Sequence, residues 1–214
     1  MTSLSTRSRL HSGKRNAIKL IAGGVIAAAA LSLMAACSQE EKAQFKSIDL
    51  TGADYAKAFS LTDQNGQMRS LNDFAGRVVV VFFGFTQCPD ACPTTMAELA
   101  QIKKQLGPDG DKLQAIFVTV DPERDTPELL KAYMANFDPT FLALRPSTDK
   151  LPELAKDFKI YYKKVEGKTP GSYTMDHSAG SYVYDTKGRV RLYYRYGSGV
   201  DALTSDIRLL LKAA

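Results

Sequence analysis

The sequence is poor in the residues that most often carry chemistry: its 214 residues include three cysteines and two histidines. Covalent haem attachment needs a histidine directly after a Cys-x2-Cys pair, and no such motif is present. The G-x-S-x-G turn of serine hydrolases and the Walker phosphate loop are also absent, and no pair of carboxylates stands out. The few cysteines and histidines are therefore the first residues to consider as catalytic or metal-binding groups.

The first 36 residues predict an export signal rather than part of a fold. They begin with five basic residues: Arg7, Arg9, Lys14, Arg15 and Lys19. An apolar stretch over 20–30 follows, and Met34-Ala35-Ala36-Cys37 is typical of a lipobox, in which Cys37 is lipidated and becomes the first mature residue. The alternative is an uncleaved membrane anchor, for which the apolar run is short. Both interpretations predict a bacterial cell-envelope protein that is anchored to a membrane and faces the periplasm.

The net charge of +5 belongs to this predicted signal. It holds five of the 28 basic residues and none of the 23 acidic ones, so the rest of the chain has 23 of each. The charge therefore does not imply a nucleic-acid partner, and we expect none. Residues 37–57 are polar and predict a tether, and the length of the remainder, 58–214, suits one domain with a sizeable core.

Hydrophobic patterning predicts a βαβ unit in the middle of the chain. The run over 78–83 is β-branched and aromatic throughout, which is typical of a strand that is buried on both faces. Pro93 and the spacing of the next apolar residues predict a helix over 93–106, and 113–120 predicts a second buried strand. Two cysteines, Cys88 and Cys92, follow the carboxyl end of the first strand, where open α/β sheets bind ligands.

The second half of the chain completes the predicted fold. We expect a helix over 126–137 that begins with Thr126 as its N-cap, a strand over 141–144, a helix over 149–158, a hairpin of 180–185 with 189–196, and a closing helix over 203–211. This order, βαβ, an inserted helix and then ββα, is typical of a thioredoxin-like fold. The prediction is a single α/β domain with a central mixed sheet that is flanked by helices.

Cys88 and Cys92 are the residues best suited to chemistry. The start of a helix favours thiolate, which is the form that acts as nucleophile and as metal ligand. A structural disulfide across so short a loop would restrict the unfolded chain little. The C-x3-C spacing is also one residue longer than the C-x2-C of thioredoxin-type enzymes.

His177 is the only histidine outside the predicted signal, and it lies just before the predicted hairpin. In a thioredoxin-like fold this position is able to approach the carboxyl end of the first strand. Two thiolates and one imidazole are too few for a structural zinc site, but they suit Cu(I). The neighbours Asp176 and Met175 are either auxiliary groups or a solvated acid and a packing residue.

Two other charged segments are expected to be solvated. The run D-P-E-R-D-T-P over 121–127 predicts a capped turn at the end of a strand. Lys163, Lys164 and the arginines of the predicted hairpin predict solvated faces rather than a binding patch.

Three motifs together resemble the Sco/SenC family. They are Cys88-Pro89-Asp90-Ala91-Cys92-Pro93, the run over 121–127, and Asp176-His177-Ser178, and the resemblance extends from about residue 59 to the end of the chain. Members of this family are membrane-tethered, thioredoxin-like copper proteins linked to the assembly of cytochrome c oxidase. The resemblance implies that Cys88, Cys92 and His177 bind copper.

Two functions follow as hypotheses. In the first, a copper metallochaperone binds Cu(I) or Cu(II) and delivers it to the copper-bearing subunit of cytochrome c oxidase at the CuA centre, or to another periplasmic copper or thiol protein. In the second, a membrane-tethered thiol–disulfide oxidoreductase attacks with Cys88 and resolves with Cys92, on oxidase cysteines or in defence against oxidative stress. A peroxide-responsive thiol protein is a third interpretation. His177 separates them, because a reductase does not need a distant imidazole.

Overall fold

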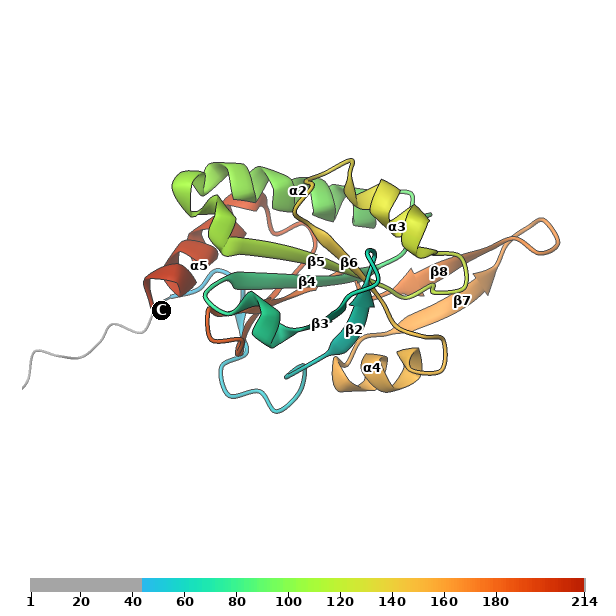
Figure 1. Cartoon of the computed structure of the whole chain (residues 1–214), viewed down its shortest axis with the longest axis horizontal. Helices are drawn as coiled ribbons and strands as arrows, with labels where there is room; N and C mark the ends of the chain where they lie inside the picture. The colour runs from blue at the N-terminus through green and yellow to red at the C-terminus, as the bar shows by residue number, and fades with distance from the viewer. Residues whose placement is uncertain (1–43, 214) are drawn as a thin grey trace, which may run out of the picture. The chain divides into compact units, whose positions relative to one another are not determined.

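Two adjacent strands form the centre of the fold (Figure 1). The computed structural model describes residues 44–213. β4 (Val78–Gly84) and β5 (Leu113–Thr119) pair in parallel, with Val78 opposite Leu113 and Gly84 opposite Thr119. Every residue of both strands is buried. The two predicted buried strands are therefore confirmed, and both are covered on each face.

The other strands of the main sheet extend on both sides of this pair. Eight strands of the described residues lie in the order β1-β10-β9-β4-β5-β6-β2-β3. The flanking strands are β1 (Ile48–Asp49), β2 (Ser60–Asp63), β3 (Met68–Ser70), β6 (Leu142–Arg145), β9 (Ser181–Tyr184) and β10 (Val190–Tyr194). β4, β5 and β6 are parallel and the remaining pairs are antiparallel. The predicted hairpin of 180–185 with 189–196 is confirmed as β9 and β10.

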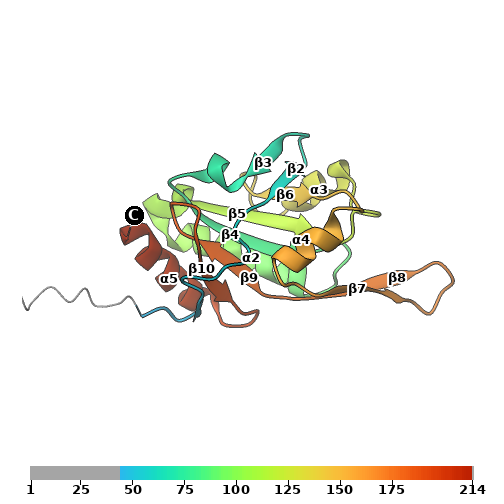
Figure 2. The same cartoon turned by 90° about the horizontal axis from the view of Figure 1, so that it is seen from below.

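Helices cover both faces of this sheet (Figures 1 and 2). The four α-helices of the described residues are α2 (Ala91–Gln105), α3 (Pro127–Met134), α4 (Leu151–Asp157) and α5 (Val200–Lys212), with 3-10 turns at Leu71–Phe74 and Gly107–Lys112. α2 and α3 lie on one side, where α5 packs beside α2, and α4 lies on the other. Thr126 caps α3 as predicted, because its Oγ1 accepts a hydrogen bond from the Leu129 backbone N–H at 3.3 Å. The predicted thioredoxin-like α/β architecture is thus confirmed.

A second, two-stranded sheet projects from the main one. β7 (Tyr162–Glu166) and β8 (Tyr173–His177) pair with each other in antiparallel fashion, with Tyr162 opposite His177. Figures 1 and 2 both show this hairpin extending beyond the end of the main sheet. Its side chains are mostly exposed or half-buried, and Met175 is the buried one. Alternate residues of β8 face inward, but β7 places Lys164 and Glu166 opposite Met175 and Tyr173, so hydrophobic periodicity does not mark the hairpin.

The folded domain begins earlier than residue 58, so residues 44–57 of the predicted tether belong to it. β1 pairs with β10, and the side chain of Ala56 is buried in the core. The backbone N–H groups of Lys46 and Ser47 both donate to the carboxylate of Asp206 on α5, each at 2.8 Å. Asp206 is fully buried, so this contact ties residues 44–57 to the domain.

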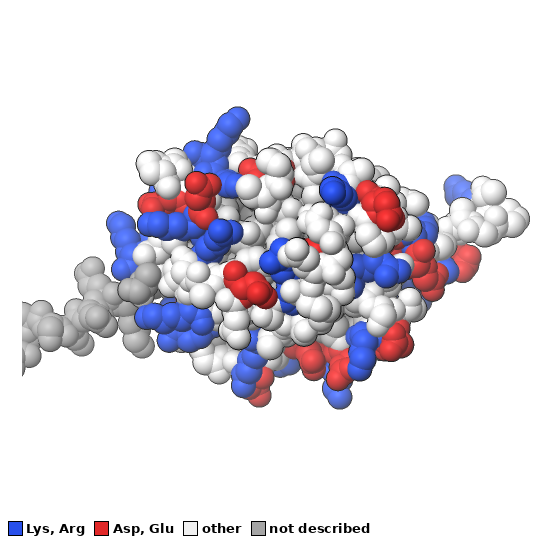
Figure 3. Space-filling model, in the orientation of Figure 1, with Lys and Arg blue, Asp and Glu red and all other residues white. Residues whose placement is uncertain are grey.

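The predicted export signal and Cys37 lie outside the described residues. Within residues 44–213, the helices are all too short or too polar to cross a membrane. Lys and Arg side chains alternate with Asp and Glu over the face seen in Figure 3.

Candidate metal centre

The cysteine loop connects the end of β4 to the start of α2. Cys88 is half-buried, and Cys92, in the first turn of α2, is completely buried. Both are free cysteines. The backbone N–H of Cys92 donates to Cys88 Sγ at 3.4 Å. The first N–H groups of a helix have no partner within the helix, so this bond directs the positive end of α2 toward the sulfur of Cys88.

His177 reaches the cysteines from the last position of β8. Its Nε2 lies 3.5 Å from Cys92 Sγ, and its Nδ1 lies 3.0 Å from the carbonyl oxygen of Ser178. A carbonyl oxygen only accepts hydrogen bonds, so Nδ1 carries the proton and Nε2 presents its lone pair to the sulfur. The donor atoms of Cys88, Cys92 and His177 all lie within 4.8 Å of one another. The fold therefore brings together the three side chains that the sequence singled out.

The surroundings of these groups are apolar. The rings of Phe82 and Phe85 contact the His177 imidazole edge to face, at centroid distances of 6.0 and 5.7 Å. Burial lowers the pKa of His177 and raises that of the Cys92 thiol. Without metal, the site therefore holds a neutral thiol against a neutral imidazole. The imidazole is already in the form that binds a metal, whereas Cys92 has to lose a proton first.

Gly84, the last residue of β4, leaves space for the sulfur of Cys92. A Cβ at this position would lie 2.8 Å from Cys92 Sγ, 2.8 Å from the Phe82 ring and 2.9 Å from the Phe117 ring. A side chain at this position would push Cys92 Sγ away from β4, so the close approach of Cys92 to the strand requires glycine. Gly84 was not predicted as a site residue, although a glycine that ends a buried apolar strand just before the cysteine loop is a visible signal.

The prediction of a solvated turn over 121–127 is wrong for its two aspartates. Asp121 is 3 % exposed and Asp125 is fully buried. The Asp125 carboxylate accepts hydrogen bonds from the Thr119 hydroxyl, at 2.5 Å, and from the hydroxyl and backbone N–H of Thr86. Burial raises the pKa of Asp125, against the effect of these bonds. Because Thr86 lies two residues before Cys88, Asp125 holds the start of the cysteine loop in place.

The remaining candidates lie outside the donor cluster. Asp176 is exposed, whereas Met175 is buried in the core, which supports its interpretation as a packing residue. Lys164 is an exposed member of an ion pair with Glu123, at 3.2 Å. Arg189 and Arg191 both contact the carboxylate of Asp185; the Arg189 side chain is 61% exposed, as expected for a solvated face, whereas that of Arg191 is 20% exposed.

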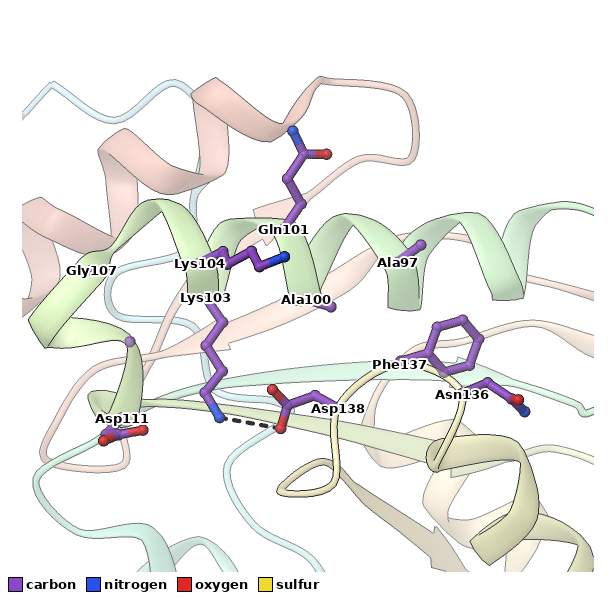
Figure 4. Close-up of a pocket in the computed structure, with 11 residues that line it drawn as sticks. Ala97, Ala100, Gln101, Lys103, Lys104, Gly107, Asp111, Asn136, Phe137 and Asp138 are labelled. Atoms are coloured by element: carbon purple, nitrogen blue, oxygen red, sulfur yellow. Dashed lines mark hydrogen bonds and ion pairs between the residues drawn. The ribbon is translucent and has the colours of Figure 1, made fainter.

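A separate hollow of about 560 Å³ lies between α2 and the loop after α3 (Figure 4). Lys103 Nζ points across it and pairs with the Asp138 carboxylate at 3.2 Å. The same ammonium group donates to the hydroxyl of Thr140 at 2.6 Å. The charge of Lys103 is thus already neutralised, and none of the three clustered donors lines this hollow.

Solved structures of similar proteins share this fold. The chain is 37% identical to Bradyrhizobium japonicum ScoI, solved with copper bound, with a TM-score of 0.65 over 72% of this chain and 97% of that one. A SCO1/SenC family lipoprotein from Bacillus anthracis is 25% identical, with a TM-score of 0.62 over 74% and 98%. BsSco, described with a disulfide switch and as a member of the Sco family of cytochrome c oxidase assembly proteins, is 25% identical, with a TM-score of 0.60 over 81% and 100%.

Similar sequences agree with the structural likeness. An SCO2-like protein of Rickettsia typhi is 39% identical over 134 residues, which are 62% of this chain and 66% of that protein. The mitochondrial SCO2 homolog of Bos taurus is 34% identical over 152 residues, which are 70% of this chain and 57% of that protein. The matched region thus spans less than two thirds of the length of these relatives. A family model described as SCO1/SenC matches residues 49–212. The chain therefore belongs to the SCO1/SenC family.

Proposed function

We propose that this protein is a copper metallochaperone whose ligands are Cys88, Cys92 and His177. The observation that carries the proposal is the meeting of two sulfurs and the unprotonated nitrogen of an imidazole within 4.8 Å, although 85 residues separate Cys92 from His177. Thiolate and imidazole donors select copper over hard cations, and three donors suit Cu(I). The copper bound to the similar ScoI structure supports the same assignment.

The burial of the two cysteines suggests how copper enters and leaves. Cys88 and His177 are half-buried, whereas Cys92 is completely buried. We propose that copper first meets Cys88, and that the Cys92 thiol then loses its proton and becomes the second ligand. Copper leaves in the reverse order: a ligand from the recipient protein first replaces Cys88, and the other two ligands are exchanged afterwards.

The proposed recipient is the copper-bearing subunit of cytochrome c oxidase, at its CuA centre. The support comes from a relative, because BsSco is described as a member of a family of cytochrome c oxidase assembly proteins. The proposed location is the periplasmic side of a bacterial membrane, with a lipid on Cys37 as the anchor. The lipobox-like Met34-Ala35-Ala36-Cys37 supports this location, and the similar Bacillus anthracis protein is described as a lipoprotein.

A second function, thiol–disulfide exchange, is favoured by the unequal environments of the two cysteines. The more exposed Cys88, which accepts the helix N–H, is the sulfur placed to attack a substrate disulfide. Attack forms a mixed disulfide and releases one substrate thiolate. The Cys92 thiol then passes its proton to the released thiolate, and its sulfur attacks Cys88 Sγ and displaces the second substrate thiolate, so two electrons pass to the substrate and Cys88–Cys92 becomes a disulfide. The same oxidation would remove two of the three copper ligands.

The test is an anaerobic Cu(I) titration of the reduced protein against a competing chelator. We expect one tightly bound copper, and a loss of at least about tenfold in affinity for His177→Ala, since even outer groups of metal sites contribute that much. Asp176→Ala is the matched control, because Asp176 is exposed and adjacent but outside the donor cluster. Unchanged affinity in His177→Ala would refute the chaperone site. Disulfide reduction that needs neither His177 nor copper would favour the second function.

A further inference from the structure

His177 lies on a hairpin that the main sheet does not hold. β7 and β8 pair with each other and with no strand of the eight-stranded sheet. At the His177 end, Ser178 N–H donates to the Tyr161 carbonyl, and Tyr161 N–H donates to the Ser178 hydroxyl, each at 2.9 Å. These bonds also join one strand of the hairpin to the other. Contacts other than strand pairing therefore fix the distance between His177 and the cysteines, and the core packing of Met175 and the rings of Phe82 and Phe85 are among them.

Arg124 supplies such contacts to three segments. Its Nη1 donates to the Tyr173 carbonyl oxygen at 2.8 Å and to Gln87 Oε1 at 3.0 Å. Its Nε donates to Asp121 Oδ2 at 2.5 Å. Tyr173 begins β8, Gln87 directly precedes Cys88, and Asp121 follows β5. One guanidinium group thus connects the strand that carries His177, the cysteine loop and the end of a central strand.

The aromatic ring of Tyr173 completes this arrangement. The guanidinium carbon of Arg124 lies 3.6 Å from the ring centroid, and the Tyr173 hydroxyl donates to Asp121 Oδ1 at 2.9 Å. The third guanidinium nitrogen, Nη2, is buried without a hydrogen-bond partner, so the stacked ring is its main compensation. We name the four residues Gln87, Asp121, Arg124 and Tyr173 the Arg124 clamp.

The clamp differs from the other ionic contact of the hairpin in its burial. The side chains of Arg124 and Asp121 are 20% and 3% exposed, whereas those of Lys164 and Glu123 are 45% and 56% exposed. Charged hydrogen bonds that are shielded from water are the stronger kind, and exposed ion pairs contribute little. Lys164 also lies 3.9 Å from the centroid of the Tyr173 ring, which makes it a close control.

We infer that Arg124 is a positioning residue for the metal site: the clamp holds β8, and His177 with it, against the cysteine loop. This inference rests on the proposed copper function. Arg124 acts through His177 and does not itself belong to the donor cluster. Without the clamp, only the packing of Met175 and of the imidazole itself holds the ring 3.5 Å from Cys92 Sγ, so we expect this distance to vary.

The test is a double-mutant cycle on Cu(I) affinity with Arg124→Gln and His177→Ala. We expect Arg124→Gln to weaken binding about tenfold when His177 is present and less than about twofold when it is absent, because the two changes remove the same interaction. Lys164→Gln should leave the affinity unchanged. An equal loss in both backgrounds would overturn the inference and make Arg124 a stabiliser of the whole fold. If His177→Ala alone has no effect, the proposed copper function fails instead.

A second measurement needs no metal and tests the clamp by itself. We expect backbone amides of β7 and β8 to exchange hydrogen about tenfold faster in Arg124→Gln, with exchange in β4 and β5 unchanged. Arg124→Lys serves if the glutamine variant does not fold. It keeps the charge near the Tyr173 ring but loses the forked hydrogen bonds, so exchange should again be faster in the hairpin alone. Unchanged hairpin exchange in the folded variant would refute the clamp.

Discussion

Substitution of Gly84 by alanine would place a methyl group directly against the metal site. The added Cβ would lie 2.8 Å from Cys92 Sγ and from the Phe82 ring, and 2.9 Å from the Phe117 ring, whereas ordinary contacts begin at 3.4 Å. Each neighbour would have to move by about half an ångström. The strand has little freedom to yield, because Gly84 pairs with Thr119 in the centre of the sheet. The sulfur of Cys92 would therefore move relative to His177.

The expected cost follows from the three contacts. Insertion of a methyl group into a packed core lowers the free energy of unfolding by about 1–3 kcal/mol. Alanine also reduces the conformational entropy of the unfolded chain relative to glycine, which raises the free energy of unfolding by about 0.4–1 kcal/mol. A net destabilisation of about 1–2 kcal/mol remains. Because the displaced atom is a proposed ligand, we also expect Cu(I) affinity to fall about tenfold, as it does for disturbed groups near other metal sites.

The assay combines urea unfolding with the competitive Cu(I) titration. Gly76→Ala is the control, since Gly76 has a φ of +84° and no atom within 4 Å of an added Cβ. The Gly76→Ala variant should lose about 1 kcal/mol of unfolding free energy through backbone strain and keep its copper affinity. If Gly84→Ala binds copper as tightly as the unaltered protein, the space at Gly84 does not matter for the site and the reasoning is refuted.

Three further results are expected. Burial lowers the pKa of His177 below 6.5, so the unfolded chain takes up a proton first as the pH falls. The metal-free protein should therefore lose stability in urea below pH 6.5, and His177→Gln should lose less; parallel pH profiles would contradict this. Burial raises the pKa of the Cys92 thiol, so at least this proton is released on binding and Cu(I) affinity should rise at least about tenfold from pH 6.5 to 7.5; a flat profile would show that no proton is released. Asp206→Asn should lower the free energy of unfolding in urea by about 1–3 kcal/mol without changing copper affinity, because the carboxylate accepts hydrogen bonds from the backbone of Lys46 and Ser47. Unchanged stability would mean that these residues behave as the predicted tether.

The elements that could be predicted from the sequence are those with a strong local signal. The runs over 78–83 and 113–120 are apolar throughout, and they form β4 and β5 to within one residue at each end. Thr126 and Pro127 mark the start of α3 by side-chain chemistry alone. The scarcity of cysteine and histidine is also enough to single out Cys88, Cys92 and His177 from the sequence.

The remaining features depend on contacts between distant segments. β7 places a lysine and a glutamate opposite Met175 and Tyr173 of β8, so no apolar alternation marks both strands. The burial of Asp125 depends on Thr86, which lies 39 residues earlier in the chain. Arg124 looked like part of a solvated turn because its partner Tyr173 lies 49 residues further on. Charged residues are solvated by default, and only tertiary partners reveal the exceptions.

The central claim is that copper is bound by Cys88, Cys92 and His177 together. The most direct measurement is X-ray absorption at the copper edge of the reduced protein loaded with one equivalent of Cu(I). We predict two sulfur neighbours and one nitrogen neighbour, and the loss of the nitrogen in His177→Ala. Coordination by sulfur alone in the unaltered protein, or a nitrogen neighbour that persists in His177→Ala, would contradict the claim.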